Sequence, residues 1–518
     1  MPAPVPLSSR TSAAAAGWGC GERADIGALY REGYVPRRFS WFSPRPLWLS
    51  RNDRLSGVLT GVVAAERHRW TQAQRRRGIE DLTVGTFAGR EEVSFLVLGD
   101  TGEGDNSQYH VVRPLLASAE GTSFTCIVSD VIYPAGDVSD YEDKFLHPYR
   151  PLPGPIYAVP GNHDWYDGLH GFMTLLCGAD PDLRPPARRE PILWKRLLHR
   201  CLWRQASETA QDELERLRSL RPHVSNQPGP YFAIELHDLL LVGIDTGIDG
   251  TLDAEQAAWL RTVSALDTDK ILLTGKPLIA NARRKEVSMD GPDRTVNALV
   301  ENAANRYIAV IGGDIHNYQR YEVSHDGRTV QYVVSGAGGA YTKATHTIPL
   351  VTPENSGCTE SHFRCYPRRG DSLATYSVLF DRRFGRGKGL FVVPREEAPA
   401  LMSEHLGGTV QPTVEEDRAA RVSLRARIAA RFVLPQPRGL FHRLFSEYLD
   451  WDLPDPPLFK SFLRVDVRPG EIEIRCFGVT GCAEHESNPT LEDHIVGTRA
   501  GEGQWWWQDL TVETPVAE

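Results

Sequence analysis

The stretch PIYAVPGNHD, residues 155–164, joins the two features that organise this chain. An apolar run rich in β-forming residues ends at Pro160, and polar loop residues follow at once. The same change ends five other runs: VSFLVLGD (93–100), SFTCIVSD (123–130), DLLLVGIDTG (238–247), KILLTGKP (270–277) and YIAVIGGD (307–314). Short apolar runs bounded by Gly or Asp predict buried central strands of a sheet.

Helical patterns separate these predicted strands. In DAEQAAWLRTVSAL, residues 253–266, Asp253 can cap a helix whose apolar side chains recur at helical spacing, at Ala257, Leu260, Val263 and Leu266. Strands that alternate with helices indicate an α/β protein. In such sheets ligands bind beyond the carboxyl ends of the strands, so we expect the polar residues after the runs to share one site.

The length, composition and net charge limit the classes of protein to which the chain can belong. The chain has 518 residues, 41% of them hydrophobic, which is enough for a large core. A net charge of -9 argues against a general nucleic-acid-binding protein. The eight cysteines are sparse, so we expect mostly reduced thiols. The sequence predicts no secretory signal and no membrane-spanning segment, hence a cytoplasmic protein, and it leaves the oligomeric state open.

The pattern predicts three regions. Residues 1–90 are expected to be an N-terminal extension of unknown role, residues 91–482 the main domain, and residues 483–518 a tail whose three tryptophans (505–507) suggest docking onto a surface or partner. The main domain carries insertions at about 177–225, predicted to form one or two amphipathic helices, and at about 346–455. The two alternating arms of residues 462–479 flank a Pro-Gly turn and predict a hairpin that completes a sheet.

Four polar residues at or just beyond strand ends are of the types that bind metal ions: Asp100, Asp130, Asn162 and His316. Hydrolysis of a phosphoester at neutral pH needs a strong nucleophile and compensation for phosphoryl charge, and two adjacent cations supply both. Taken singly, each residue is typical of a turn, a helix cap or a polar surface. GNHD, preceded by a strand ending in Asp and followed by a strand ending in GGDIH, is a much more specific combination.

Over roughly residues 93–345, with the later hairpin as a final piece, the chain resembles the calcineurin-like metallophosphoesterases, and among them the purple acid phosphatases. The resemblance implies a β-sandwich of two mixed sheets flanked by helices, in α-β-β-α layers. It also implies a first metal site made by Asp100, the bridging Asp130, Tyr133 as a ligand of ferric iron, and His316. The alternative for Tyr133 is a structural aromatic packed beside the site.

The same resemblance assigns Asn162 to a second metal, His163 to substrate contact or leaving-group protonation, and Asp164 to orienting that histidine. The second site departs from the family, because Lys276 and Asp314 stand where histidines are usual. Either Asp130, Asn162 and Asp314 still hold a second ion, with Lys276 pairing Asp314 or the substrate phosphate, or the Lys276 ammonium replaces that ion. The expected cofactors are one or two metal ions, iron with manganese, zinc or magnesium at the second position.

The resulting expectation is a metal-dependent hydrolase of phosphoester bonds that uses a metal-bound hydroxide and acts on a phosphorylated substrate. The alternative is a catalytically impaired protein of the same fold that acts as a binding or scaffold module. A basic run could attract the substrate as a lid but is more typical of a solvated helix face: Arg184, Arg188, Arg189, Lys195, Arg196, Arg200 and Arg204.

Overall fold

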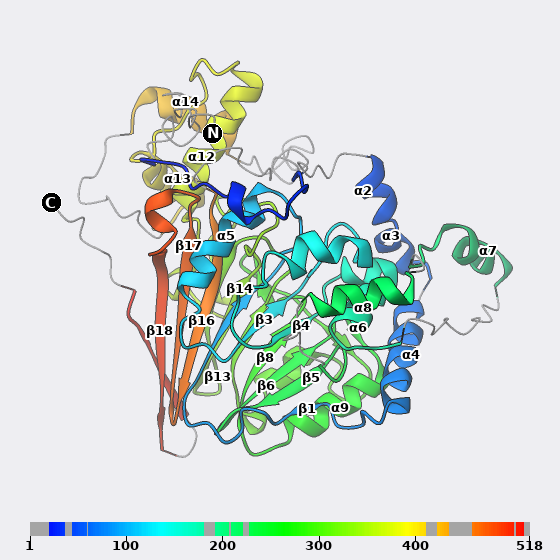
Figure 1. Ribbon diagram of the computed structural model, residues 1–518. Coiled ribbons are helices and arrows are strands. Elements are labelled where there is room, and N and C mark those ends of the chain that lie inside the picture. Colours follow the sequence, from blue (N-terminus) through cyan, green and yellow to red (C-terminus); the bar gives the residue numbers. More distant parts are fainter. Residues whose placement is uncertain are drawn as a thin grey trace.

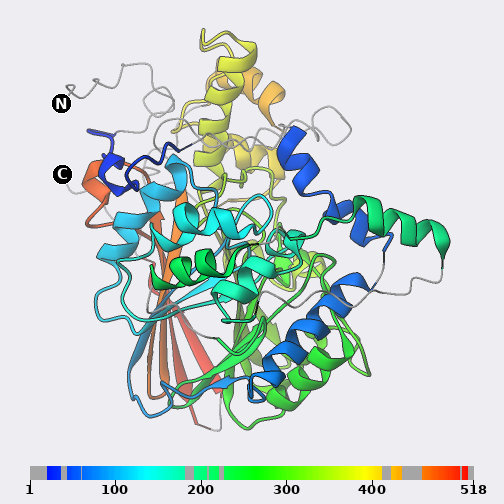
Figure 2. The same cartoon turned by 45° about the vertical axis from the view of Figure 1, so that its right-hand side comes forward.

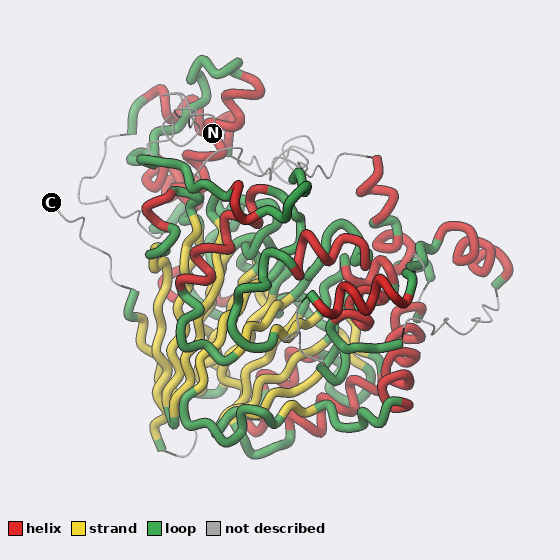
Figure 3. Tube along the Cα trace, in the orientation of Figure 1, coloured by secondary structure: helices red, strands yellow, loops and turns green. Residues whose placement is uncertain are grey.

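The computed structural model describes residues 20–36, 44–59, 61–180, 192–206, 209–220, 227–410, 422–434, 458–501 and 504–511. Two large sheets face each other in it (Figure 1). Figure 3 shows their strands lying together, with helices around them. The expected α/β sandwich with helices on both outer faces is confirmed.

The first sheet has seven strands in the order β19-β18-β17-β16-β2-β3-β4. Their bounds along the chain are β2 Val93–Leu98, β3 Phe124–Val128, β4 Ile156–Val159, β16 Lys460–Arg468, β17 Glu471–Val479, β18 Thr490–Ala500 and β19 Gln504–Asp509. Strands β2, β3 and β4 run parallel, whereas β16 to β19 continue the sheet antiparallel. The predicted hairpin is therefore confirmed as β16 and β17.

The second sheet has eight strands in the order β1-β5-β6-β8-β12-β14-β13-β15. Their bounds are β1 Thr83–Val84, β5 Phe232–Glu235, β6 Leu239–Ile244, β8 Asp269–Thr274, β12 Tyr307–Gly312, β13 Tyr318–His325, β14 Arg328–Ser335 and β15 Phe363–Tyr366. Strands β6, β8, β12 and β14 are parallel. Two small pairs lie apart: β9 Ile279–Ala280 with β10 Arg283–Arg284, and β7 Thr251–Leu252 with β11 Ser288–Met289.

The helices form the outer layers. Their bounds are α2 Pro44–Leu49, α3 Asn52–Ser56, α4 Val62–Arg76, α5 Asn106–Ala117, α6 His170–Leu175, α7 Leu193–Leu202, α8 Gln211–Ser219, α9 Ala254–Ser264, α10 Val296–Glu301, α11 Pro353–Ser356, α12 Arg369–Phe384, α13 Ala398–Leu406 and α14 Leu424–Val433. Asp253 caps α9 as expected, but α9 ends before Leu266, whose side chain is exposed. In the described part of the chain, no helix is long and apolar enough to cross a membrane.

Alternating side chains explain why the predicted strands are apolar throughout. On β2, Phe95 and Val97 face the core between the sheets, and Leu96 and Leu98 face the core under the helices. A strand covered on both faces needs apolar residues at every position. The six apolar runs are thus confirmed as buried strands.

The expected domain limits differ from the observed packing. The expected tail contributes β18 and β19 to the first sheet, where Trp505 is buried and its indole N–H donates to Asp269. The insertion at 346–455 contributes β15 to the second sheet. Helices α12, α13 and α14 of that insertion pack around a small core of their own. The earlier insertion, expected to form one or two amphipathic helices, contains the two helices α7 and α8 in its described part.

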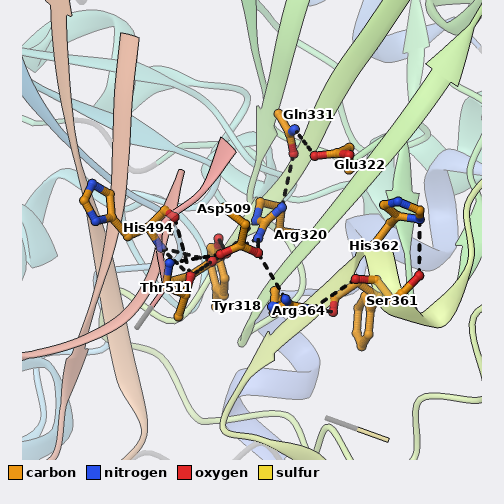
Figure 4. A network of polar contacts seen from close by, with 12 residues as sticks. Tyr318, Arg320, Glu322, Gln331, Ser361, His362, Arg364, His494, Asp509 and Thr511 are labelled. Atoms are coloured by element: carbon orange, nitrogen blue, oxygen red, sulfur yellow. Dashed lines mark hydrogen bonds and ion pairs between the residues drawn. The ribbon is translucent and has the colours of Figure 1, made fainter. Parts of the chain in front are cut away.

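A buried ion-pair network joins the C-terminal strands to the opposite sheet (Figure 4). The Arg320 guanidinium on β13 lies 2.6 Å from a carboxylate oxygen of Asp493 on β18 and 2.8 Å from one of Asp509 on β19. Arg364 on β15 also reaches Asp509, at 3.1 Å. Since Arg320 and Asp493 are almost fully buried, each neutralises a charge that would otherwise be costly.

The expectation of mostly reduced thiols is confirmed, with one disulfide that the sequence did not predict. Cys20 and Cys482 form a disulfide across 462 residues of sequence, while six other cysteines are free thiols. The positions of the cysteines in the sequence could not predict this disulfide, because Cys20 and Cys482 come together only when residues 20–24 lie along the loop after β17.

Candidate metal centre

The site lies where parallel strands of both sheets end. Asp100, Asp130 and Asn162 follow β2, β3 and β4, and Asp314 follows β12. Three of these residues, Asp100, Asp130 and Asp314, have positive φ angles of 57°, 29° and 68°. Such angles are uncommon for residues other than glycine and cluster at functional sites, where surrounding contacts hold them.

Tyr133 joins three of the candidate ligands. Its hydroxyl oxygen lies 3.0 Å from Asp100 Oδ1, 2.9 Å from Asp130 Oδ2 and 3.1 Å from His316 Nε2. All four side chains are buried. His316 Nδ1 lies 2.9 Å from the Tyr341 carbonyl oxygen, so Nδ1 carries the hydrogen and Nε2 presents its lone pair to the centre.

These four residues fit a metal ion. Adjacent ligands of a six-coordinate ion with bonds of roughly 2.1 Å are roughly 3.0 Å apart, which is the spacing around the Tyr133 hydroxyl. Burial, together with the charges of Asp130 and Asp314, raises the pKa of Asp100 well above its usual value. A cation would offset this repulsion. Asp100, Asp130, Tyr133 and His316 therefore offer ligand atoms of suitable types for one metal ion, with His316 Nε2 3.8 Å from Asp100 Oδ1.

A second set lies beside it. Asp130 Oδ1 accepts a hydrogen bond of 2.8 Å from the His163 backbone N–H, and the Asp314 N–H donates to Asp100 Oδ2 at 2.8 Å. The Asn162 amide nitrogen donates to the Tyr166 hydroxyl at 2.7 Å, which presents Oδ1 as the ligand atom. Burial raises the pKa of Asp130, and Asp314 adds to the effect while His163 opposes it. The atoms that Asp130, Asn162 and Asp314 could offer to a second metal ion are all oxygens, and oxygen ligands suit hard cations.

Lys276 differs from what the sequence suggested. Its ammonium donates to the Ile248 carbonyl oxygen, and the described interactions of this side chain include no ion pair with Asp314. Of the two partners expected for Lys276 in the first arrangement, Asp314 is not its partner in this conformation, and pairing with a substrate phosphate stays a prediction. The Asp314 charge lies close enough to affect Asp100 and Asp130, so it acts on the carboxylates of the centre.

The roles expected for the GNHD loop also change. His163 Nδ1 lies 2.8 Å from the Pro134 carbonyl oxygen, which orients the ring. The Asp164 carboxylate accepts three backbone N–H bonds, from Val131, Ile132 and Gly161. Asp164 thus holds the loops after β3 and β4 together. The group that orients the His163 ring is the Pro134 carbonyl and not, as expected, the Asp164 carboxylate.

Two tyrosines near the centre were not anticipated. Tyr166 contacts Asn162 through its hydroxyl, and its ring centroid lies 4.7 Å from that of His163. The Tyr341 ring lies 4.3 Å from that of His316. Tyr341 follows GAGG at 336–339, where a Cβ on Gly336 would approach Asp100 Oδ2 to 2.6 Å. In the sequence, the glycine-rich run at 336–339 was the feature that could have predicted a loop packed closely against the centre.

Comparison with known families supports this description. The family model described as "Metallophos: Calcineurin-like phosphoesterase" matches residues 93–199, which include Asp100, Asp130, Tyr133 and the GNHD loop. The expected resemblance to calcineurin-like phosphoesterases is thereby confirmed. Lys276, Asp314 and His316 lie beyond the matched segment. None of the curated proteins matches the chain.

Solved structures show distant likenesses. A purple acid phosphatase from yellow lupin (Lupinus luteus) seeds is 10% identical, with 80% of this chain and 55% of that chain covered and a TM-score of 0.39. The solved structure of PhoD is 10% identical, with 83% of this chain and 73% of that chain covered and a TM-score of 0.37. The match to the lupin protein thus spans about half of that protein's length. At these scores neither likeness assigns a function.

Proposed function

We propose that the protein is a metal-dependent phosphoesterase. The observation that carries this proposal is the convergence of Asp100, Asp130 and His316 on the Tyr133 hydroxyl, at distances of 2.9 to 3.1 Å, beside the GNHD loop. A purely structural polar cluster would not need four buried ionisable groups around one point, because burying each of them is costly. The match of residues 93–199 to a phosphoesterase family supports the same reaction class.

The chain's own residues have separate tasks in this proposal. Bound cations would supply an activated water and offset charge on the phosphoryl oxygens. Asp100, Asp130, Tyr133 and His316 would hold the first ion, and Asp130, Asn162 and Asp314 the second. His163, held by the Pro134 carbonyl, is partly exposed beside the ligand residues, so its imidazole would donate a proton to the departing alkoxide.

The structure favours two ions over a lysine that replaces one. For the Lys276 ammonium to act as the second cation it would have to face Asp130 or Asp314, but it donates to the Ile248 carbonyl. Elemental analysis of the purified chain tests the choice. We expect close to two metal atoms per chain, and one in an Asp314→Ala variant. A value near one for the wild type would support lysine replacement instead.

Iron at the first position follows from Tyr133, if the purple-acid-phosphatase pattern holds. A phenolate bound to ferric iron absorbs visible light, so we expect a coloured protein and loss of the band in Tyr133→Phe. Because Tyr133 is buried, thermal unfolding should first show that the variant is folded. Iron-loaded wild type without colour would leave Tyr133 as a structural aromatic.

Hydrolysis of an aryl phosphate monoester and of its diester tests the activity. With manganese or iron added, we expect turnover by the wild type and a loss of at least about 100-fold in Asp130→Asn, which keeps the shape of the side chain but removes the charge. Equal rates in the two proteins would exclude the proposed site. A folded, metal-loaded and inactive wild type would favour the alternative, a binding or scaffold module.

A further inference from the structure

Helix α7, Leu193–Leu202, projects from the body of the protein (Figures 1 and 2). None of its residues is buried, which separates it from the helices that cover the sheets. Four large apolar side chains of this short helix are exposed; the exposed fraction is 71% for Leu193, 56% for Trp194, 63% for Leu197 and 36% for Leu202. Ile192, directly before the helix, is 43% exposed. Water-exposed apolar residues at this density mark a surface that contacts something else.

The polar residues of α7 have one sign of charge. At 3.6 residues per turn, Leu193, Trp194, Leu197 and Leu202 fall on one half of the helix surface. The opposite half carries Lys195, Arg196, His199 and Arg200, and the helix contains no acidic residue. This contrasts with the whole chain, whose net charge is -9. Of the basic run expected to be a solvated helix face, Lys195, Arg196 and Arg200 lie on α7, Arg204 is buried, and Arg184, Arg188 and Arg189 lie outside the described residues. On the apolar half of α7, Leu198 packs against the core of the protein, whereas the four side chains named above remain exposed.

The base of α7 is firmly held. Trp203 and Arg204, directly after the helix, are buried. Arg204 donates to the Ala135 carbonyl at 3.1 Å and pairs with Asp137, and both residues follow Tyr133 in its loop. Asn52 donates to the Arg204 and Tyr166 carbonyls at 3.1 and 3.2 Å. The helix is therefore presented by a rigid attachment close to the loops of the metal centre.

We propose that α7 is an interfacial helix that docks the protein onto an anionic lipid surface. Leucine and tryptophan would enter the boundary between headgroups and acyl chains, while Lys195, Arg196 and Arg200 would contact lipid phosphates and carboxylates. Charge complementarity favours this occupant, because a basic helix without acidic residues is attracted by a uniformly negative surface. At about 15 Å, α7 is too short to span a bilayer and suits an orientation in its plane.

Co-sedimentation of the full chain with vesicles tests the proposal. We expect binding to phosphatidylcholine vesicles that contain 30% phosphatidylserine, little binding to pure phosphatidylcholine, and a blue shift of tryptophan emission on binding. The Leu193→Gln/Leu197→Gln variant should bind at least about tenfold more weakly, since each leucine loses its apolar contact. Lys195→Glu/Arg196→Glu should remove the preference for anionic vesicles.

Leu266→Gln is the matched control, because this leucine is also exposed but follows α9, away from α7. It should bind like the wild type. The α7 variants should keep the wild-type melting temperature, because the helix buries no side chain. Wild type that stays in the supernatant with anionic vesicles would overturn the proposal. So would undiminished binding by the double leucine variant, or a dimer in gel filtration that only the α7 substitutions dissolve.

Discussion

Ser129 has a backbone φ of 76° directly before Asp130. Left-handed conformations cost a residue with a Cβ about 1–2 kcal/mol, and this position is usually glycine in the family that the chain resembles. The buried Ser129 hydroxyl also has no hydrogen-bond partner among the described residues. We therefore predict that Ser129→Gly raises the free energy of unfolding by about 1 kcal/mol, as measured by urea denaturation of the metal-loaded protein.

Gly161 provides the opposite comparison in the same site. A Cβ at this position would lie 2.1 Å from Asp130 Oδ1 and 2.3 Å from the Asp130 nitrogen. Gly161→Ala should therefore destabilise the protein and displace the carboxylate. If Ser129→Gly were neutral or destabilising, the left-handed backbone would be supported by contacts that serine makes better than glycine.

Tyr166 governs how Asn162 is presented. With the phenol hydroxyl removed, the amide nitrogen of Asn162 loses its 2.7 Å partner and Oδ1 is no longer fixed toward the centre. We predict that Tyr166→Phe weakens binding of the second metal ion by about tenfold and leaves the first ion in place. Metal titration followed by elemental analysis would show this, and equal affinities in variant and wild type would contradict it.

At the residue scale the sequence predicted where the candidate ligand residues lie, and their role as metal ligands stays a prediction. Asp100, Asp130, Asn162 and His316 follow strands, and the strands were visible as apolar runs. The hydrogen bonds that form between these loops could not be predicted from the sequence. The bond from Tyr166 to Asn162 and the three amide donors to Asp164 depend on how two loops fold back on each other.

Helix α4 shows what was missed at the scale of elements. Its residues lie in the expected N-terminal extension, yet the Arg67 guanidinium lies 2.7 Å from Asp245 and 2.7 Å from Asp253, and is almost fully buried. Trp70 is buried as well and donates to the Gly168 carbonyl, just after the GNHD segment. The extension is thus part of the domain, and α4 supports the end of the metal-centre loop.

We predict that Arg67→Met costs about 3–5 kcal/mol of unfolding free energy, because it leaves the fully buried Asp245 without a counterion. Thermal and urea unfolding would measure the loss. Arg75→Met is the matched control on the same helix, since its ion pair with Glu255 is exposed and should contribute less than about 1 kcal/mol. Similar effects of the two substitutions would show that burial does not set the difference.

For the whole molecule, the Cys20–Cys482 disulfide connects the first described residue to the loop after β17. Closing so long a loop restricts the unfolded chain, so we predict that Cys482→Ser lowers the free energy of unfolding by about 2–5 kcal/mol. Wild type in a reducing agent should behave like the variant in denaturant titrations. If the reducing agent leaves the midpoint of oxidised wild type unchanged, the disulfide does not contribute.

The location in the cell stays a prediction. The sequence predicts a cytoplasmic protein, but reducing conditions keep most cytosolic thiols unpaired. Trapping free thiols at the moment of cell lysis would show whether Cys20 and Cys482 are paired there. A paired state would favour an oxidising compartment, and two free thiols would fit the cytoplasm.

The sequence by itself determined the layers of this protein and the residue types at its candidate centre. Apolar runs that must be covered on both faces define the central strands, and the residues directly after them are the candidate ligands. Tertiary structure decided the pairing of distant parts: β18 and β19 in the first sheet, α4 against Asp245, Lys276 on a carbonyl and α7 in solvent. Local patterns fix a segment's conformation, whereas its partners depend on contacts between residues hundreds of positions apart.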